Sequence, residues 1–406
     1  MTIGSLLFIE PNTEYLTLLL RHVKALDYEA IVVSSFSDFT QLNQVHNFDL
    51  ILVNIELLEQ QQGEAQALLK DATVIILGLV KALDSHQLEG YFKLGICDYL
   101  TYDCGPRAIS ARLKSGLERR RQEQQVQTQK ELLKYERELQ IGRQIQLDFL
   151  PDSLPKLDNW EILSYFSPAR DVAGDFYDSF LLANGRVGLV LADVCDKGVG
   201  AALFMALFRS LIRSLSQQNY SLGVLDFLSE DKPMTRSQGQ GRRVAPSAGT
   251  TALRNTMTLT NNYIANTHSR SNMFATIFFG ILDPASGMMI YINGGHEPLI
   301  WTNREGEIKG RLQPTGPAVG MLPDMTFDIE QVQLEVGDML LAYTDGVTEA
   351  HDLDRKLFSE ARLLDIAKKP KDSAQELLDQ VVEGVRNHIG QAEQFDDITM
   401  LAVHRL

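Results

Sequence analysis

The chain has 406 residues, 44% hydrophobic and 22% charged, a composition typical of a globular protein with two or three domains. Its net charge of −15 excludes nucleic acid as the main partner, because a polyanion would be repelled. No run of about 20 apolar residues and no basic leader occurs, so we expect a cytoplasmic protein without a membrane span. Its three cysteines (Cys97, Cys104 and Cys195) lie outside any C-x-x-C pattern and are expected to be reduced thiols.

Short apolar runs in residues 1–105 predict a doubly wound α/β domain with a parallel sheet. The five strands are expected at residues 5–10, 30–33, 49–55, 73–79 and 97–100, with helical patterns between them. Continuous apolar runs are typical of strands that are covered on both faces.

This order resembles the response-regulator receiver domain, but the residues of phosphoryl transfer are missing. Asn54 stands where receivers have the phosphoacceptor aspartate, and Glu10 stands alone where they have an acidic pair. Gly78 and Tyr102 replace the hydroxyl residue and the lysine. Because a neutral amide does not accept a phosphoryl group as a carboxylate does, we interpret this domain as a pseudo-receiver that serves docking or dimerisation.

Residues 106–150 are expected to form a helical linker. No proline occurs in this segment after residue 106, and an apolar stripe at three-to-four spacing includes Leu132, Tyr135 and Leu139. We predict a long helix that pairs in a parallel coiled coil and makes the protein a homodimer. Two shorter helices with a frayed joint are the alternative. Pro151 and Pro155 end the helix.

Residues 151–406 predict an α+β domain of packed sheets with helices outside. Strand-like runs include EILSYFSPA, GRVGLVLADV, MFATIFFGILD, MMIYINGG, PLIWTN, GDMLLAYTDG and ITMLAVHRL. Two helical stretches are expected at 201–215 and from about 250 to 267. The polar segment 229–249 between them is expected to be a mobile insertion loop.

Aspartates recur in this domain where apolar strands meet turns. Asp175, Asp193, Asp345 and Asp396 each adjoin such a strand, and Asp397 follows the last of them. A single aspartate of this kind is usually a solvated turn residue. Four of them together favour a site for hard divalent metal ions.

Six motifs in a fixed order resemble the PPM-type, metal-dependent serine/threonine phosphatases in the bacterial SpoIIE-like branch. They read DVAGDFYD, ADVCDKGVGAA, FATIFFG, NGGHEP, GDMLLAYTDGVTEA and DDIT. The resemblance implies a β-sandwich of two antiparallel sheets flanked by helices.

The resemblance also implies a ligand set for two Mn²⁺ or Mg²⁺ ions. This set comprises Asp175, Asp193, Asp345, Asp396 and the backbone carbonyl of Val194. Asp193 would bridge both ions, and the water they share would attack phosphorus. Two further aspartates are expected to support this set, Asp397 behind the ligands and Asp178 through hydrogen bonds to metal-bound water.

Arg170 and His296 each have two alternative roles. Arg170 lies five residues before Asp175, where some family members have a phosphate-binding arginine, and a surface salt bridge is the alternative. His296 is expected either to act as a general acid or to stabilise its loop. Cys195 and Asp196 depart from the Ser-Gly that is more usual in the family.

The favoured function is hydrolysis of phosphoserine or phosphothreonine on a partner protein, which the resemblance suggests is a small anti-sigma-factor antagonist. A metal-dependent nucleotidyl cyclase and a non-catalytic phosphoprotein-binding scaffold are the alternatives. A cyclase needs only two such acids and a scaffold needs none, so the four aspartates favour the phosphatase.

Overall fold

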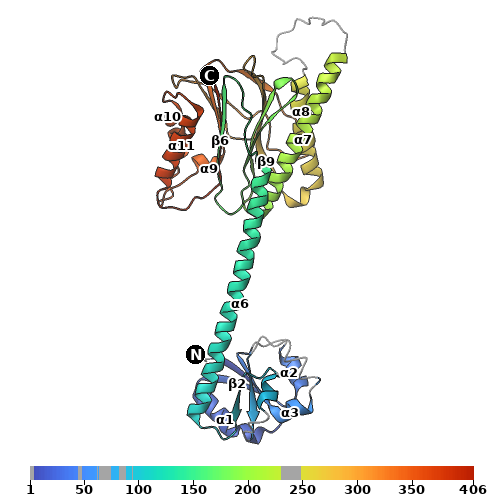
Figure 1. Ribbon diagram of the computed structural model, residues 1–406, viewed down its shortest axis with the longest axis vertical. Helices are drawn as coiled ribbons and strands as arrows, with labels where there is room; N and C mark the ends of the chain where they lie inside the picture. The colour runs from blue at the N-terminus through green and yellow to red at the C-terminus, as the bar shows by residue number, and fades with distance from the viewer. Residues whose placement is uncertain are drawn as a thin grey trace. The chain divides into compact units, whose positions relative to one another are not determined.

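The computed structural model describes residues 4–43, 48–61, 63, 75–81, 88–93, 95–229 and 248–406 (Figure 1). It divides into two compact units, Met1–Tyr135 and Glu136–Leu406. Helix α6 (Pro106–Phe149) contributes its first part to one unit and its last part to the other. The insertion predicted at 229–249 lies almost wholly outside the described residues.

The N-terminal unit contains a five-stranded parallel sheet in the order β2-β1-β3-β4-β5, which confirms the predicted doubly wound arrangement. Its strands are β1 (Gly4–Ile9), β2 (Tyr28–Val33), β3 (Leu50–Asn54), β4 (Ile75–Val80) and β5 (Asp98–Thr101). Its helices include α1 (Thr13–Ala25), α2 (Phe36–Asn43), α3 (Ile55–Gln60) and α5 (Leu88–Lys93). One face of the sheet packs under α1 and the start of α6, and the other under α2 and α3.

Helix α6 is continuous over 44 residues, as the missing prolines predict. Ile109 and Leu113 near its start are fully buried in the core of the N-terminal unit. Further along, Leu132, Tyr135 and Ile145 are 55%, 60% and 53% exposed. The helix therefore has an apolar stripe that neither unit covers.

The C-terminal unit is a sandwich of two five-stranded antiparallel sheets. One sheet has the order β13-β10-β9-β8-β7 and the other β12-β11-β14-β15-β6. The strands of the first are β7 (Phe176–Leu181), β8 (Val187–Val194), β9 (Ala275–Leu282), β10 (Met288–Gly294) and β13 (Glu330–Gln333). Those of the second are β6 (Trp160–Ser167), β11 (Leu299–Thr302), β12 (Ile308–Leu312), β14 (Met339–Tyr343) and β15 (Ile398–Arg405).

Helices cover both outer faces of the sandwich. Helices α7 (Val199–Ser229) and α8 (Ala248–Thr267) pack on the first sheet, and α9 (Asp345–Thr348), α10 (Ser359–Ala367) and α11 (Ala374–Ile389) pack on the second. Figure 1 shows the pair α7 and α8 on the opposite side of the strands from α10 and α11. Two single 3-10 turns, η1 (Ala183–Gly185) and η2 (Ser269–Ser271), complete the described elements.

The prediction of only two helical stretches in this unit was incomplete, because α10 and α11 were missed. Ser373 caps α11, and its Oγ accepts a hydrogen bond from the backbone N–H of Glu376 at 3.1 Å. The apolar residues Leu377, Val381 and Val385 follow at helical spacing and are buried. This S-x-x-E pattern before a periodic run is a helix-start signal that the sequence carries.

Within α7, residues Val199–Ser221 are long and apolar enough, by length and composition, to cross a membrane. One face of this stretch packs into the core of the unit through Ala201, Met205, Phe208 and Ile212, each at most 1% exposed. That packing explains its apolar composition as that of a core helix.

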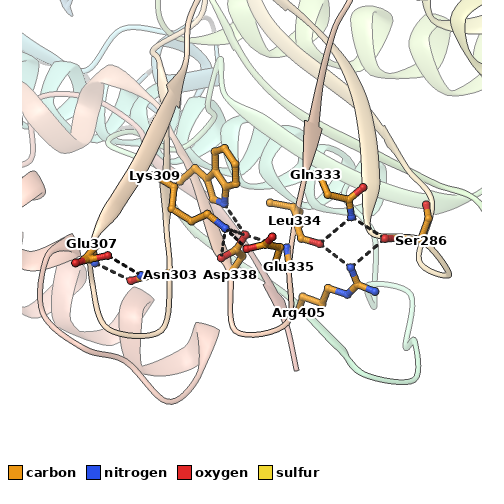
Figure 2. A network of polar contacts seen from close by, with 10 residues as sticks. Ser286, Asn303, Glu307, Lys309, Gln333, Leu334, Glu335, Asp338 and Arg405 are labelled. Carbon is orange, nitrogen blue, oxygen red and sulfur yellow. Dashed lines mark hydrogen bonds and ion pairs between the residues drawn. The ribbon is translucent and has the colours of Figure 1, made fainter.

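Polar side chains form a network of hydrogen bonds and ion pairs at one end of the sandwich (Figure 2). Asp338, 2% exposed, accepts hydrogen bonds from Lys309 Nζ at 2.7 Å and from Trp301 Nε1 at 3.0 Å. Arg405 NH1 donates to the carbonyls of Ser286 and Leu334 (Figure 2). These contacts fix the start of β14 and the end of β15, so the opposite ends of these two strands lie at the other end of the sandwich.

Candidate metal and phosphate site

The strand pairing brings the four predicted aspartates to one end of the sandwich. Asp175 directly precedes β7 and Asp193 is next to last in β8, and these strands pair with Phe176 opposite Ala192. In the second sheet, Asp345 follows the end of β14 and Asp396 precedes β15, with Tyr343 opposite Met400. Antiparallel neighbours present the start of one strand beside the end of the next, so each sheet contributes two aspartates.

The two sheets are joined at this end by close contacts. Thr344 Oγ1 donates a hydrogen bond to Asp175 Oδ2 at 2.8 Å, across the sandwich. A Cβ added at Gly174 would lie 2.8 Å from the carbonyl oxygen of Val194, and one at Gly346 would lie 1.9 Å from that of Asp397. Glycine at both positions lets the segments with the carboxylates approach each other.

The carboxylates disturb each other's ionisation. Burial, followed by the charges of Asp345 and Asp396, raises the pKa of Asp193 to about 7. Burial and the charge of Asp396 raise the pKa of Asp345 to about 6. The pKa of Asp175 also rises well above its usual range, through burial and then the charges of Asp193 and Asp397. Such a concentration of negative charge is stabilised by bound cations.

The donor set fits Mn²⁺ or Mg²⁺, which prefer carboxylate and carbonyl oxygen. Among the described residues, however, no three His, Cys, Asp or Glu side chains already converge on a single ion position. Two of the aspartates have other partners: Asp175 accepts from Thr344, and Asp396 Oδ2 lies 2.7 Å from Lys197 Nζ. A cation bound by Asp396 Oδ2 would therefore compete with Lys197 for this oxygen.

Asp397 organises the loop that leads to Asp175. Its Oδ1 accepts the backbone N–H of Ala169 at 2.7 Å and its Oδ2 that of Gly174 at 2.8 Å. Both ends of the segment that contains Arg170 are thereby fixed to the start of β15. This geometry agrees with a supporting role for Asp397.

The same loop is held from the other side by Gln146 near the end of α6, a residue that the sequence analysis did not single out. Its Nε2 donates to the carbonyl of Ala173 at 2.6 Å, and its Oε1 accepts the N–H of Ala173 at 2.9 Å. Gln146 is 6% exposed and Ala173 is fully buried. The helix that leaves the N-terminal unit thus contacts the chain two residues before Asp175.

Asp178 lies elsewhere than expected. It is on β7 and faces α7, where Arg209 Nε lies 3.2 Å from its Oδ2 and Arg213 NH1 lies 3.2 Å from its Oδ1. Because side chains alternate along a strand, Asp178 shares the face of Phe176, which packs in the core under α7 and α8. The structure therefore gives Asp178 a role in anchoring α7 and not in holding water at the carboxylate cluster.

Two cations lie beside the cluster. Arg170 is exposed and lines a cavity together with Lys197 and Phe395. Lys197 Nζ pairs with Asp396 and also donates to the carbonyl of Phe395 at 2.9 Å. No ion pair of Arg170 occurs among the residues that the structure describes.

His296 is enclosed within the domain and is 2% exposed. Its Nδ1 lies 3.0 Å from Thr276 Oγ1, and its backbone N–H donates to Asn293 Oδ1 at 2.8 Å. Burial lowers its pKa to about 4. A neutral, enclosed imidazole stabilises its loop and is poorly suited to donate a proton to a leaving group.

Asp196, which stands where the family more often has glycine, has a left-handed backbone with φ of 73°. Aspartate tolerates this region better than most residues. Its Oδ1 accepts the N–H of Lys197 at 2.8 Å, which stabilises the turn into α7. Cys195 Sγ accepts the N–H of Phe274 at 3.2 Å and so has a structural contact of its own.

In the N-terminal unit, the residues at the receiver-like positions form a closed hydrogen-bond network. Asn54 Nδ2 donates to Glu10 Oε2 at 2.8 Å, and the hydroxyl of Tyr102 also donates to Glu10. Asn54 Oδ1 accepts the N–H of Leu57 at 2.9 Å and caps α3. Glu10 is fully buried, and both polar groups of Asn54 are occupied within the domain.

Comparison with known proteins identifies the C-terminal unit. Residues 183–406, more than half of the chain, match the family described as Stage II sporulation protein E (SpoIIE). The chain belongs to the SpoIIE family. Its C-terminal unit accordingly contains a SpoIIE-type domain.

Individual relatives of this SpoIIE-family chain differ in length. The protein IcfG of Synechocystis sp. is 46% identical over 268 residues, which are 66% of this chain but only 41% of IcfG. The phosphoserine phosphatase RsbU of Bacillus subtilis is 23% identical over 268 residues, 66% of this chain and 70% of RsbU. The SiaA-PP2C domain of Pseudomonas aeruginosa has a TM-score of 0.48 at 20% identity, over 68% of this chain and 98% of that one.

Proposed function

We propose that this SpoIIE-family protein hydrolyses phosphoserine or phosphothreonine on a partner protein in the cytoplasm. The observation that carries the proposal is the convergence of Asp175, Asp193, Asp345 and Asp396 at one end of the sandwich, where the pKa values of Asp175, Asp193 and Asp345 are raised. When bound there, two Mn²⁺ or Mg²⁺ ions would supply a water activated for attack on phosphorus.

The chain's own residues have distinct roles in this proposal. Asp175, Asp193, Asp345, Asp396 and the carbonyl of Val194 would hold the ions. Thr344 orients Asp175, and Asp397 fixes the loop that presents Arg170. The guanidinium of Arg170 would bind two phosphoryl oxygens and so orient the ester bond towards the cluster.

The proposed partner is a small phosphorylated anti-sigma-factor antagonist. The support is similarity to RsbU, whose name describes a phosphoserine phosphatase. The long helix α6 would pair with that of a second chain, since Leu132, Tyr135 and Ile145 form an exposed apolar stripe. The N-terminal unit would then act as a pseudo-receiver, because the network of Glu10, Asn54 and Tyr102 lacks a phosphoacceptor carboxylate.

Assays of phosphopeptide hydrolysis, cyclic nucleotide formation and phosphopeptide binding test the function. The purified full chain should release phosphate from phosphoserine peptides in the presence of Mn²⁺, and it should form no cyclic nucleotide from ATP or GTP. Cyclic nucleotide production without peptide hydrolysis would replace the proposal by the cyclase alternative. Tight binding of phosphopeptide with no turnover at any Mn²⁺ concentration would replace it by the scaffold alternative.

A further inference from the structure

A cavity of about 760 Å³ lies directly beside the carboxylate cluster. Its walls come from the loop with Arg170, from Lys197 before α7, from the turn with Arg355 and from the segment that ends at Phe395. Phe395 directly precedes Asp396, and Lys197 pairs with Asp396 at 2.7 Å. The cavity therefore adjoins the carboxylate cluster, and its size suits several side chains of a bound segment.

Cationic side chains outnumber carboxylates in the lining of this cavity. Arg170, Lys197 and Arg355 line it together with two carboxylates, in a chain whose net charge is −15. Among the described residues neither Arg170 nor Arg355 has an ion pair, whereas Lys197 already pairs with Asp396. Two guanidinium groups are thus free to bind anions from outside the chain.

Among the described residues, the two carboxylates on the wall form no ion pair with these arginines. Asp352 Oδ1 accepts the backbone N–H of Lys356 at 3.0 Å, which commits it to the local turn. Glu393 is exposed to solvent on the segment before Phe395.

Arg355 occupies a backbone position that ordinarily favours glycine. Its φ is 61°, in a turn where its N–H donates to the carbonyl of Asp352 at 3.0 Å. A residue with a Cβ is disfavoured there, and glycine would relieve the strain. Arginine in place of glycine adds a cationic side chain to the cavity wall.

Apolar side chains complete the rim. Leu353 is 71% exposed and Phe395 is 55% exposed, and both line the cavity. Lys197 Nζ lies 4.0 Å from the centre of the Phe395 ring and holds it at the boundary with the cluster. The surface thus combines free cations with exposed apolar groups beside the phosphate site.

We propose that this cavity, here called the Arg355 pocket, binds an acidic side chain that lies near the phosphorylated residue in the substrate protein. The inference rests on the proposed phosphatase function and adds a specificity for substrate sequence. Arg355 contacts the substrate carboxylate, Arg170 contacts the phosphoryl group, and Leu353 and Phe395 pack against the neighbouring substrate residues.

The test uses the full chain with Mn²⁺ and two phosphoserine peptides that differ only in glutamate or glutamine beside the phosphoserine. Wild type is compared with Arg355→Gln and with a control, Arg254→Gln, which removes an exposed arginine of α8 outside the pocket. We expect Arg355→Gln to raise KM for the acidic peptide about tenfold and to leave kcat unchanged. KM for the neutral peptide and turnover of p-nitrophenyl phosphate should not change, and Arg254→Gln should behave as wild type.

Charge reversal gives an independent readout. Arg355→Glu should prefer a peptide with lysine at the variable position over the one with glutamate. Dissociation constants from fluorescence anisotropy of the same peptides, labelled, should follow the KM values. Equal KM values and equal affinities of wild type for the acidic and neutral peptides would overturn the inference, as would an unchanged preference in Arg355→Glu.

The two proposals fail in different ways. If no ester is hydrolysed with any metal ion but Arg355→Gln still weakens binding of the acidic phosphopeptide, the phosphatase proposal falls and the Arg355 pocket stands. If both peptides are hydrolysed at equal KM by every variant, the phosphatase proposal stands and the Arg355 pocket is refuted.

Discussion

Replacement of Gln146 by leucine should weaken both the fold of the C-terminal unit and its catalysis. The side chain makes two hydrogen bonds to Ala173, at 2.6 and 2.9 Å, in a buried position. Leucine fills a similar volume but leaves the N–H and carbonyl of Ala173 without partners. Each unsatisfied buried group costs about 1–3 kcal/mol, so the loss of two partners should lower the free energy of unfolding by about 2–6 kcal/mol.

The catalytic effect follows from the position of Ala173, two residues before Asp175. Asp397 still holds the loop at Ala169 and Gly174, so the fold should survive while the loop loses its fixed geometry. Because small displacements of reacting groups slow catalysis strongly, kcat for p-nitrophenyl phosphate should fall about tenfold or more.

The assays are urea unfolding followed by circular dichroism, and Mn²⁺-dependent hydrolysis under conditions in which the variant is folded. Gln144→Ala is the matched control, since Gln144 lies on the same helix and donates only to the exposed Asp148 at 3.1 Å. The control should stay within about 0.5 kcal/mol of wild type. An unfolding midpoint and a rate for Gln146→Leu that equal those of wild type would refute the coupling between α6 and the loop.

Three further predictions follow from other parts of the chain. The full chain should be a dimer by light scattering at micromolar concentration. The double variant Leu132→Glu, Tyr135→Glu should be a monomer, because these exposed side chains form the proposed helix–helix interface. A wild-type monomer would contradict the pairing of the helices. The N-terminal unit should not become stably phosphorylated by labelled acetyl phosphate. Asn54→Asp should not make the activity depend on phosphorylation, since the lysine and the hydroxyl residue of receivers are still absent. Stable phosphorylation of the wild-type N-terminal unit would refute the pseudo-receiver interpretation. The pKa of His296 is about 4 when folded and about 6.5 when unfolded, so its contribution to stability is complete above pH 6.5 and is lost as pH falls to 4. The stability advantage of wild type over His296→Gln should therefore shrink by about 3 kcal/mol over that range, and a constant difference in urea unfolding would contradict the burial argument.

Much of the architecture could be predicted from local patterns. The strands of the N-terminal sheet are continuous apolar runs, and the structure places all five within a few residues of the predicted ranges. The aspartates of the candidate site each adjoin a strand, so their convergence follows once neighbouring strands pair in antiparallel order. The motifs alone were sufficient to suggest the family.

Most features that the sequence did not predict depend on contacts between segments that are distant in the chain. Gln146 and Thr344 contact the loop and carboxylate of the site from elements far away in sequence, and no local pattern distinguishes them from other polar residues. Asp178 was expected beside the metal ligands because it lies close to Asp175 in the motif. Side chains alternate along β7, however, and Asp178 points towards α7. Helix α11 was missed although its cap was readable, because neighbouring strand runs dominated the interpretation of the segment.

The most direct test of the phosphatase account compares Asp193→Asn with Asp365→Asn, a control that changes an exposed aspartate of α10. Each full-length protein is assayed for phosphate release from a phosphoserine peptide over a range of Mn²⁺ concentrations, after circular dichroism has shown that it is folded. We expect Mn²⁺-dependent hydrolysis by wild type and Asp365→Asn, and background rates for Asp193→Asn at every Mn²⁺ concentration. Near-normal turnover by folded Asp193→Asn, or wild-type turnover that persists after removal of divalent ions, would contradict the phosphatase account.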